Sequence, residues 1–427
     1  MKILGYRDAS YASFVKLLNR RALPTHDVRE LVESIIAEVA GQGDKALVAY
    51  TKRFDNVVLQ EKQLFVTPEE LAAVKVSPAT RKAVAASLKN IIAFAKRGLR
   101  KDWSMLNNEG ARVGERFQPF DRVGIYVPGG KAPLVSTALM TAGFAKAAKV
   151  PEILAATPCG PDGQVNPELL YALKAAGVTE ILKVGGAQAI AAMALGTKSV
   201  RPVDRIIGPG NRFVVEAKRQ LFGAVSIDLL PGPSEILIVA DKTGNPDYIA
   251  ADLLAQAEHG GDSVIGFVTD SKALVGKVLK AIDRQLETLG RAKYIREVLK
   301  QATFMLHVKS MADAIAIAND FAAEHVSLIT ADEKKWLPQL RTSGAIYLGN
   351  DSPVAVGDFL AGPSHTLPTG GSGRSFSGLR ADQFQRRTSI VKLDKKAVRN
   401  SLAAVQEFAR IEGLDAHGRS TAIRVEG

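Results

Sequence analysis

The chain has 427 residues, of which 46% are hydrophobic and 23% are charged. This length exceeds what one ordinary core needs, so two or more globular domains are expected. The sequence has no uninterrupted apolar run of about 18 residues, which excludes a membrane-spanning helix. Its first residues carry charge at once and lack the apolar region of an export signal. We therefore expect a cytoplasmic protein.

The formal net charge of +12 could indicate a nucleic-acid partner. The basic residues, however, lie in separate segments such as 96–101 and 395–399, without the interleaved aromatic residues of a base-stacking surface. This distribution favours a solvated basic surface that modestly attracts a phosphate-bearing cofactor. Neither nucleic acid nor a membrane is expected as a partner.

Helical patterns dominate residues 7–55. Asp27 and Glu30 have the spacing of a capping box, which predicts a helix beginning there. Ser77 and Pro78 predict a second helix start, with Ser77 as N-cap, and that helix can continue to about Arg97. This leading region is interpreted as scaffold.

Short β-rich runs alternate with helical segments from Asp121 onward, which predicts parallel strands joined by right-handed crossovers. A first series predicts strands at 123–127, 152–156, 180–184, 203–207 and 225–229, separated by helices at 134–148, 166–176, 186–196 and 211–221. A second series predicts strands at 235–240, 264–269, 303–307, 325–330 and 344–348, with helices at 246–259, 271–289 and 310–320. The expected fold class is α/β with two doubly wound units.

Two later segments are distinct in composition. Residues 362–378 are rich in glycine and serine, which is typical of a long functional loop. Residues 395–417 have a helical pattern but are too few to form a core of their own. Such a helical tail is a candidate for packing on a partner subunit.

Gln256 and His259 stand three residues apart at the end of a predicted helix, just before Gly260. Their side chains therefore leave the same face of its last turn, where they could bind a metal ion. A solvated polar pair is the more common meaning of this spacing. The single cysteine, Cys159, excludes a multi-thiolate site, so any zinc would need histidine, carboxylate and amide ligands. Cys159 itself, in a turn-rich loop, is interpreted as a buried or incidental thiol.

Glycine loops follow four strands of the first series, at 126–130, 185–188, 208–211 and 230–234. Ligands of doubly wound sheets gather at the carboxyl ends of strands, and exposed N–H groups at helix starts suit an anionic ligand. One such loop is ordinary turn chemistry, whereas four at equivalent ends indicate a cofactor site. The G-x-G-x-x-G fingerprint is absent, so a dinucleotide would bind in a nonstandard way.

Acidic residues and histidines with potential for chemistry also lie late in the chain. Glu324 and His325 stand together at a strand start and could divide proton-transfer roles, although adjacent strand residues point to opposite faces unless the backbone bends. Asp358 could supply a metal-binding carboxylate, and Glu412 and His417 lie near the C-terminus. Each has an alternative interpretation as a solvated surface residue.

Eight ordered motifs together make the sequence resemble the histidinol dehydrogenase family over nearly its whole length. They are Tyr126-Val127-Pro128-Gly129-Gly130, Gly185-Gly186-Ala187-Gln188-Ala189, Gly208-Pro209-Gly210-Asn211, Pro231-Gly232-Pro233-Ser234-Glu235, Gln256-Ala257-Glu258-His259-Gly260, Glu324-His325, Gly357-Asp358 and Asp415-Ala416-His417. The resemblance implies oxidation of L-histidinol to L-histidine with NAD, in two hydride transfers through an aldehyde held on the enzyme. It also implies one zinc per subunit and a homodimer with shared active sites.

The resemblance divides the chain into four parts. It implies an N-terminal helical segment at 1–25 and a first α/β domain, with the metal and catalytic residues, at 26–121 plus 237–378. A second α/β domain at 122–236 would carry the NAD-binding loops. A helical tail at 379–427 would pack on the partner subunit. Both α/β domains would be incomplete Rossmann-like units.

The resemblance also implies roles for individual residues. The zinc ligands would be Gln256, His259, Asp358 and His417 of the partner subunit. Zinc would orient the substrate's imidazole and amine. His325 would take the alcohol proton, and Glu324 would activate water to hydrate the aldehyde. Substrate would be bound by Ser234, His365 and Glu412 together with His325 and the zinc ligands, and NAD by Tyr126, Gln188 and Asn211.

The sequence departs from the family pattern in two ways. Ser364 stands where many relatives have asparagine, and the excess of basic over acidic residues is larger than expected for the family. Neither removes a metal ligand or a proton-transfer group. The nearest alternative is a related zinc- and NAD-dependent dehydrogenase of another small alcohol, such as a sulfonated diol. Others are a zinc hydrolase that uses Glu324 as base, and a nucleic-acid binder, which would bind in a strongly salt-dependent way.

Overall fold

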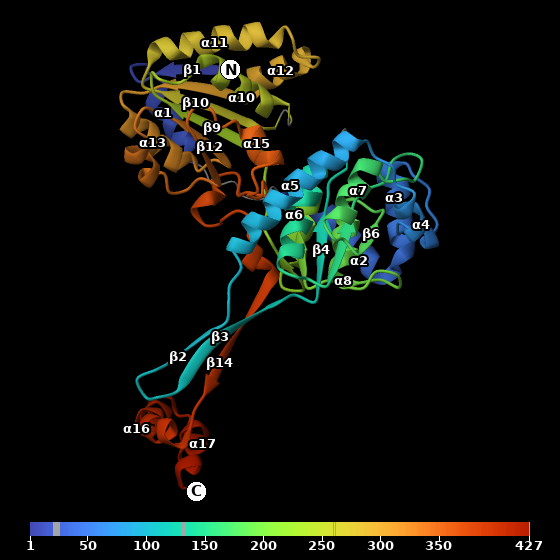
Figure 1. The fold of residues 1–427 in the computed structure, drawn as a ribbon, viewed down its shortest axis with the longest axis vertical. Helices are drawn as coiled ribbons and strands as arrows, with labels where there is room; N and C mark the ends of the chain where they lie inside the picture. The colour runs from blue at the N-terminus through green and yellow to red at the C-terminus, as the bar shows by residue number, and fades with distance from the viewer. Residues whose placement is uncertain (20–25, 130–132, 259, 261, 427) are drawn as a thin grey trace.

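The computed structural model describes residues 1–19, 26–129, 133–258, 260 and 262–426. Two parallel sheets with surrounding helices form the body of the molecule, and a long antiparallel arm carries the C-terminal helices away from it (Figure 1). Within the described residues no helix is long and apolar enough to cross a membrane.

The first sheet consists of five parallel strands in the order β6-β5-β4-β7-β8. Its strands are β4 (Arg122–Tyr126), β5 (Glu152–Ala156), β6 (Glu180–Leu182), β7 (Arg205–Ile207) and β8 (Ser226–Ile227). The intervening helices are α6 (Val135–Ala147), α7 (Pro167–Ala175), α8 (Gly186–Leu195) and α9 (Arg212–Leu221). Every predicted strand and helix of this series is present, and the central strand β4 is buried along its whole length.

The second sheet has the order β1-β11-β10-β9-β12-β13 and is also parallel throughout. Its strands are β1 (Lys2–Gly5), β9 (Glu235–Ala240), β10 (Val264–Thr269), β11 (Thr303–His307), β12 (His325–Ile329) and β13 (Ala345–Leu348). Its helices are α1 (Tyr11–Leu18), α10 (Pro246–Ala257), α11 (Lys272–Leu286), α12 (Ala292–Ala302), α13 (Met311–Phe321), α14 (Glu333–Trp336) and α15 (Val354–Phe359). Apart from the edge strand β1, which the sequence did not predict, both sheets have the same winding order. The prediction of two doubly wound units is confirmed.

Four N-terminal helices surround the first sheet: α2 (Arg29–Gln42), α3 (Asp44–Asp55), α4 (Pro68–Ala72) and α5 (Pro78–Arg97). Residues between Val28 and Ala95 share one hydrophobic core with this sheet. The core therefore groups them with 122–236, whereas the family resemblance implied that 26–121 belong with 237–378. The N-terminal strand β1 and helix α1 instead pack on the second sheet.

The two predicted helix starts have different outcomes. Ser77 caps α5 by accepting a hydrogen bond from the Thr80 N–H at 3.0 Å, as predicted. The prediction of a capping box at Asp27 is wrong, because α2 begins at Arg29 and has no side-chain cap. The Asp27 carboxylate is paired with Arg212 instead.

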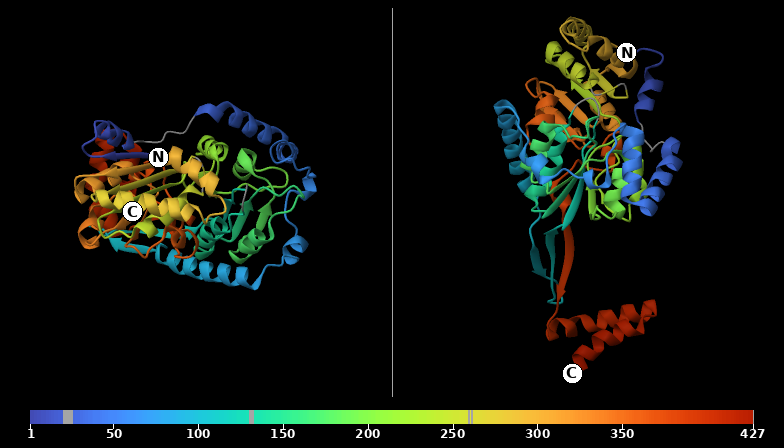
Figure 2. Two further views of the ribbon diagram at one scale, coloured as in Figure 1. Left: turned by 90° about the horizontal axis from the view of Figure 1, so that it is seen from above. Right: turned by 90° about the vertical axis from the view of Figure 1, so that its right-hand side faces the viewer.

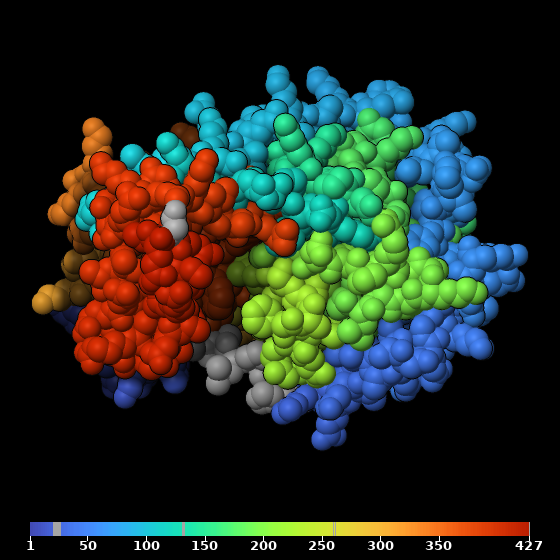
Figure 3. Space-filling model, turned by 90° about the horizontal axis from the view of Figure 1, so that it is seen from below, coloured from blue at the N-terminus to red at the C-terminus, as the bar shows by residue number. Residues whose placement is uncertain are grey.

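The arm is a three-stranded antiparallel sheet of β2 (Trp103–Leu106), β3 (Arg112–Pro119) and β14 (Gln385–Lys392). It ends in the helical tail, α16 (Lys395–Glu412) and α17 (Asp415–Glu426). Figure 2 shows the arm and tail projecting from the body, and Figure 3 shows the tail from below as the red mass at the left of the view. The helical tail is confirmed from Lys395 onward, but the strand before it was not predicted.

The carboxyl edge of the first sheet lies next to the amino edge of the second. The chain leaves β8 at Ile227 and enters β9 at Glu235, so only the short segment 228–234 joins the two edges. The predicted loop at 362–378 also crosses between the units, because Ser364 Oγ donates to the carbonyl oxygen of Met140 in α6 at 3.2 Å. A ligand held at one edge thus faces the other unit.

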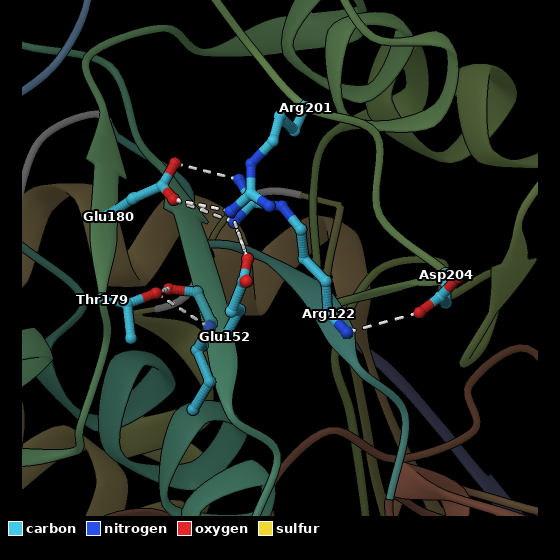
Figure 4. Close-up of polar contacts among 7 residues, drawn as sticks. Arg122, Glu152, Thr179, Glu180, Arg201 and Asp204 are labelled. Carbon is cyan, nitrogen blue, oxygen red and sulfur yellow. Dashed lines mark hydrogen bonds and ion pairs between the residues drawn. The ribbon is translucent and has the colours of Figure 1, made fainter.

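The opposite, amino edge of the first sheet is held by an ionic cluster (Figure 4). The buried Arg122 guanidinium donates to Glu152 at 2.8 Å and to both oxygens of Glu180 at 2.9 Å. Arg201 contacts the same two carboxylates from the surface. Arg122, Glu152 and Glu180 are the first residues of the neighbouring strands β4, β5 and β6, so the cluster fixes the alignment of these strands. It lies at the end of the first sheet opposite to the edge that borders the second sheet.

Candidate active site

A buried carboxylate, Glu324, occupies the amino edge of the second sheet. It immediately precedes β12, which pairs with β9 so that His325 is opposite Ile236. Ser234 Oγ and the Glu235 N–H both donate to Glu324 Oε2, at 2.7 and 2.9 Å. Burial raises the pKa of Glu324, which these hydrogen bonds and the adjacent His325 partly oppose.

The imidazole of His325 is also buried and lies beside Glu324. The backbone carbonyl of Glu235 is 3.0 Å from Nδ1, so Nδ1 carries the proton and donates it. The other ring nitrogen, Nε2, is 3.4 Å from Asp358 Oδ1. Nδ1 is also 3.6 Å from Glu324 Oε2, so the two adjacent side chains converge, because Glu324 lies in a bend before the strand begins. Burial alone would lower the pKa of His325, but the carboxylates of Glu324 and Asp358 raise it to about 9.

Gln256 and Asp358 come from two helices, α10 and α15, that contact each other. Gln256 stands in the last turn of α10, is 2% exposed, and its Nε2 has no hydrogen-bond partner within the described structure. His259 lies outside the described residues. Helix α15, which was not predicted from the sequence, brings Asp358 to within reach of His325.

Three further residues of this region were missed from the sequence. Tyr347 of β13 has its ring 6.0 Å from that of His325, and burial raises its pKa, as do the charges of Asp358, Glu324 and Asp252. Burial raises the pKa of Asp252, one turn before Gln256, to about 6. Glu235 is buried and accepts from the Gly370 N–H at 3.0 Å. The sequence did contain one indication that Glu235 could be functional, because it is an ionisable residue at the first position of an otherwise apolar strand.

His365 and Ser364 lie where the crossing loop meets the first unit. His365 Nε2 is 3.4 Å from the Thr137 hydroxyl in α6. Ser364 is buried, donates to Met140 and accepts from the Thr366 N–H at 3.2 Å. The serine therefore both donates and accepts a hydrogen bond at the position where the sequence departs from the family pattern.

Glu412 and His417 are exposed on the tail, at the far end of the arm from the second sheet (Figure 1). Within one chain they do not meet Glu324, His325 or Asp358. The described residues accordingly contain no group of three or more histidine, cysteine, aspartate or glutamate side chains that could hold a metal ion.

A cleft of about 810 Å³ lies at the carboxyl edge of the first sheet, and Tyr126, Gln188 and Asn211 all line it. The Gly186 N–H donates to the Tyr126 hydroxyl at 2.9 Å, and Asn211 caps α9 by accepting from the N–H groups of Phe213 and Val214. Gly208 has φ +122°, and a Cβ there would lie 2.1 Å from the Tyr126 carbonyl oxygen, so the loop requires glycine. Burial raises the pKa of the Cys159 thiol, in keeping with an inert cysteine.

The histidinol dehydrogenase family model matches residues 18–425. The chain belongs to the histidinol dehydrogenase family. It is 42% identical over 429 residues to histidinol dehydrogenase of Syntrophotalea carbinolica, which covers 100% of this chain and 99% of the relative. Identity to the Brucella suis enzyme is 43% over 414 residues, 96% of each chain. The crystal structure of histidinol dehydrogenase from Elizabethkingia anophelis superposes with a TM-score of 0.94 at 33% identity, covering 100% of this chain and 98% of that one.

Membership of the histidinol dehydrogenase family confirms the resemblance inferred from the eight motifs. The chain is an oxidoreductase, and histidinol oxidation in histidine biosynthesis is the activity of its family. The similarity spans both sheets, the arm and the tail, so the resemblance covers every part that carries a candidate residue.

Proposed function

We propose that this cytoplasmic enzyme oxidises L-histidinol to L-histidine in two steps, with NAD as hydride acceptor and zinc as the ion that positions the substrate. The observation that carries the proposal is the pairing of buried Glu324 and His325 at the amino edge of the second sheet, which the short segment 228–234 joins to the carboxyl edge of the first sheet, where the glycine-loop cleft lies. An acid, a base and a dinucleotide cleft at one junction suit alcohol oxidation. They leave no role for a nucleic acid.

His325 is the base in the proposed first oxidation. Because its Nδ1 proton is held by the Glu235 carbonyl, Nε2 is the atom that can accept the proton of the alcohol once the ring is neutral, a form that the raised pKa of about 9 favours only at alkaline pH. Glu324 supports the protonated ring electrostatically. The same nitrogen serves again when the hydrated aldehyde is oxidised.

Glu324 is the base that activates water in the proposed hydration of the aldehyde. Two hydrogen bonds, from Ser234 and Glu235, converge on Oε2 and leave Oε1 for water. Burial raises the pKa of Glu324 and makes it a stronger base than an exposed carboxylate. Ser234 would bind substrate as well as orient Glu324, and His365 would contact substrate from the crossing loop.

The metal-binding part of the proposal rests on Gln256, His259, Asp358 and His417 of the partner subunit. The residues present fit such a site, because Gln256 presents a buried amide with an unpaired end, on a helix that contacts the one bearing Asp358. Rotation of the amide by half a turn exchanges its oxygen and nitrogen, so the oxygen, which is the end that binds a cation, can take the position of the unpaired Nε2. Zinc, when bound, would hold the imidazole and amine of histidinol and orient its alcohol.

The cofactor-binding part rests on Tyr126, Gln188 and Asn211 in the first-sheet cleft. Gln188 Oε1 is buried and has no hydrogen-bond partner within the described residues, which fits a ligand with a donor group. The N-termini of α8 and α9 open at the same edge and suit a pyrophosphate. NAD, when bound there, would accept the hydride of each oxidation.

A second copy of the chain completes the proposed site. The arm and tail expose a set of large apolar side chains that a monomer would leave in water: Trp103, Met105, Leu106, Ile390, Val391, Phe408, Ile411 and Ile423. A symmetric dimer would cover them and bring Glu412 and His417 of one subunit to the second sheet of the other. Glu412 would then contact the substrate amine.

The test is NADH formation from L-histidinol by the metal-loaded protein. We expect a rise in NADH absorbance that is abolished by chelation and restored by zinc or a similar divalent ion. An absence of NADH formation by metal-loaded protein with both substrates would refute the assignment.

A further inference from the structure

The first-sheet cleft contains three buried polar atoms without a hydrogen-bond partner among the described residues. They are Asp55 Oδ2, Thr157 Oγ1 and Gln188 Oε1. A buried polar group without a partner destabilises the fold, because it has lost its hydrogen bonds to water. Their concentration on the walls of one cleft indicates a ligand that supplies hydrogen-bond donors.

Asp55 is the most costly of the three for the fold. It is the last residue of α3, where the free carbonyl groups of the helix end repel an anion. No ion pair joins it to another described residue, and burial raises its pKa. Folding alone gives no reason for a carboxylate here, whereas ligand binding does.

Immediately after its second strand the sheet has no acidic residue of the kind that doubly wound dinucleotide-binding domains use for a ribose. That residue ordinarily follows the second strand of the unit. The second strand here is β5, which is followed by Thr157, Pro158 and Cys159. Asp55 enters the same cleft from a helix outside the sheet, since α3 packs on α8.

We propose that Asp55 binds the adenosine-ribose hydroxyls of the dinucleotide and thereby selects NAD over NADP. An ionised carboxylate only accepts hydrogen bonds, which suits a vicinal diol. A 2′-phosphate in its place brings negative charge against negative charge and no donor. The inference rests on the proposed NAD site and assigns to it a residue that determines specificity.

The cleft also contains the carboxylate of Asp162, the other candidate for the ribose hydroxyls, and this residue serves as the comparison. This aspartate also lines the cleft, but it is exposed, and its Oδ1 accepts from the Gln164 N–H at 3.0 Å. Asp55→Asn and Asp162→Asn therefore remove the same charge from the same cleft. Only the first change removes an unpaired buried acceptor.

The experiment measures binding of NADH and NADPH to the full-length protein by their fluorescence, so that it does not depend on turnover. We expect the unmodified protein and Asp162→Asn to bind NADH at least about tenfold more tightly than NADPH, because hydrogen bonds to a charged group contribute about that much. In Asp55→Asn and Asp55→Ser the ratio should fall to about threefold or less. Thermal unfolding of each variant verifies that it is folded.

Two results would overturn the inference. One is an unchanged NADH-to-NADPH ratio in both folded Asp55 variants. The other is the absence of any preference in the unmodified protein. NADH formation from histidinol separates these failures from a failure of the proposed function: turnover with NAD and an unchanged ratio would refute only the role of Asp55. No turnover and no dinucleotide binding would refute both.

Discussion

The ammonium group of Lys218 donates a hydrogen bond to the carbonyl oxygen of Gly208 at 3.0 Å. Asp228 pairs with Lys218 through one oxygen and accepts from the Gly208 N–H through the other, at 2.8 Å. The Lys218 and Asp228 side chains are both 0% exposed. Both polar backbone groups of Gly208 are therefore fixed by a buried ion pair, at the loop that borders the proposed NAD site.

Replacing Lys218 by methionine should weaken both the fold and cofactor binding. The change leaves the Asp228 charge buried and unpaired, which costs about 3–5 kcal/mol. It also frees the Gly208 loop, so KM for NAD should rise more than KM for histidinol. Thermal unfolding and steady-state kinetics measure the two effects.

Lys300→Met is the control for Lys218→Met, because its ion pair with Glu297 is exposed and an exposed pair contributes at most about 1 kcal/mol. Equal increases in the two KM values of Lys218→Met would contradict a specific effect on the NAD loop.

The proposed division between His325 and Glu324 predicts distinct kinetic defects. His325→Ala should suppress oxidation of the alcohol, since the base that takes its proton is gone. Glu324→Gln keeps an oxygen that can accept from Ser234 and Glu235 but loses the base that activates water. It should slow oxidation of supplied histidinaldehyde by about 10²–10⁴-fold and alcohol oxidation less. Identical losses on both substrates in both variants would argue against separate roles.

The proposed shared site predicts recovery of activity when two inactive variants are mixed. In a dimer of His417→Ala with His325→Ala, one site combines an intact second sheet with an intact tail, and the other carries both defects. Random exchange should restore about a quarter of the unmodified activity, because half of the dimers have one complete site. The measurement is NADH formation after mixing, with subunit exchange verified by mass. If His417 acted within its own chain, exchange would restore nothing.

The ionic cluster around Arg122 predicts a stability difference that depends on pH. Hydrogen bonds from Arg122 lower the pKa of Glu180 below its ordinary value. That stabilisation is present above the unfolded pKa of about 4.3 and is lost as pH falls through the lower folded pKa. Arg122→Met should therefore cost about 2 kcal/mol of unfolding free energy near neutral pH, and the difference should shrink in acid.

Arg201→Met is the matched control for Arg122→Met. Arg201 contacts the same carboxylates, but its side chain is 63% exposed against 7% for Arg122. Chemical denaturation at several pH values measures both variants. A difference for Arg122→Met that does not change with pH would contradict the electrostatic origin.

The sequence was most informative where strands are buried on both faces. The strands from Arg122 to Leu348 are short apolar runs between turn residues, and a parallel sheet covered by helices produces that pattern. Strand β14 was missed because nearly all its residues are exposed, so neither face has a consistent polarity. The edge strand β1 is short and partly exposed, and its pairing with β11 joins residues about 300 positions apart along the chain, too far for any local pattern to reveal.

The candidate site was predictable in its residue types but not in its geometry. Glycine loops at strand ends indicated a cofactor cleft because that edge of a parallel sheet is fixed by topology. The convergence of Glu324 and His325 depends on a bend before β12, and the approach of Asp358 depends on α15, a helix of only six residues. Asp252 and Tyr347 become relevant only through their three-dimensional neighbours, which no local pattern encodes.

The shared winding order of the two sheets means that one architecture occurs twice in a chain without an obvious sequence repeat. In the second unit the crevice at the carboxyl ends of its two central strands is filled by the chain itself: the Asp241 carboxylate accepts from Thr243, from the Thr330 hydroxyl and from the Ala331 N–H. One aspartate thus takes the place that an anionic ligand would occupy in a hollow crevice. The candidate residues of the second unit therefore lie at its amino edge, whereas those of the first unit lie at its carboxyl edge. The same winding order thus places the two sets of candidate residues at opposite edges of their sheets.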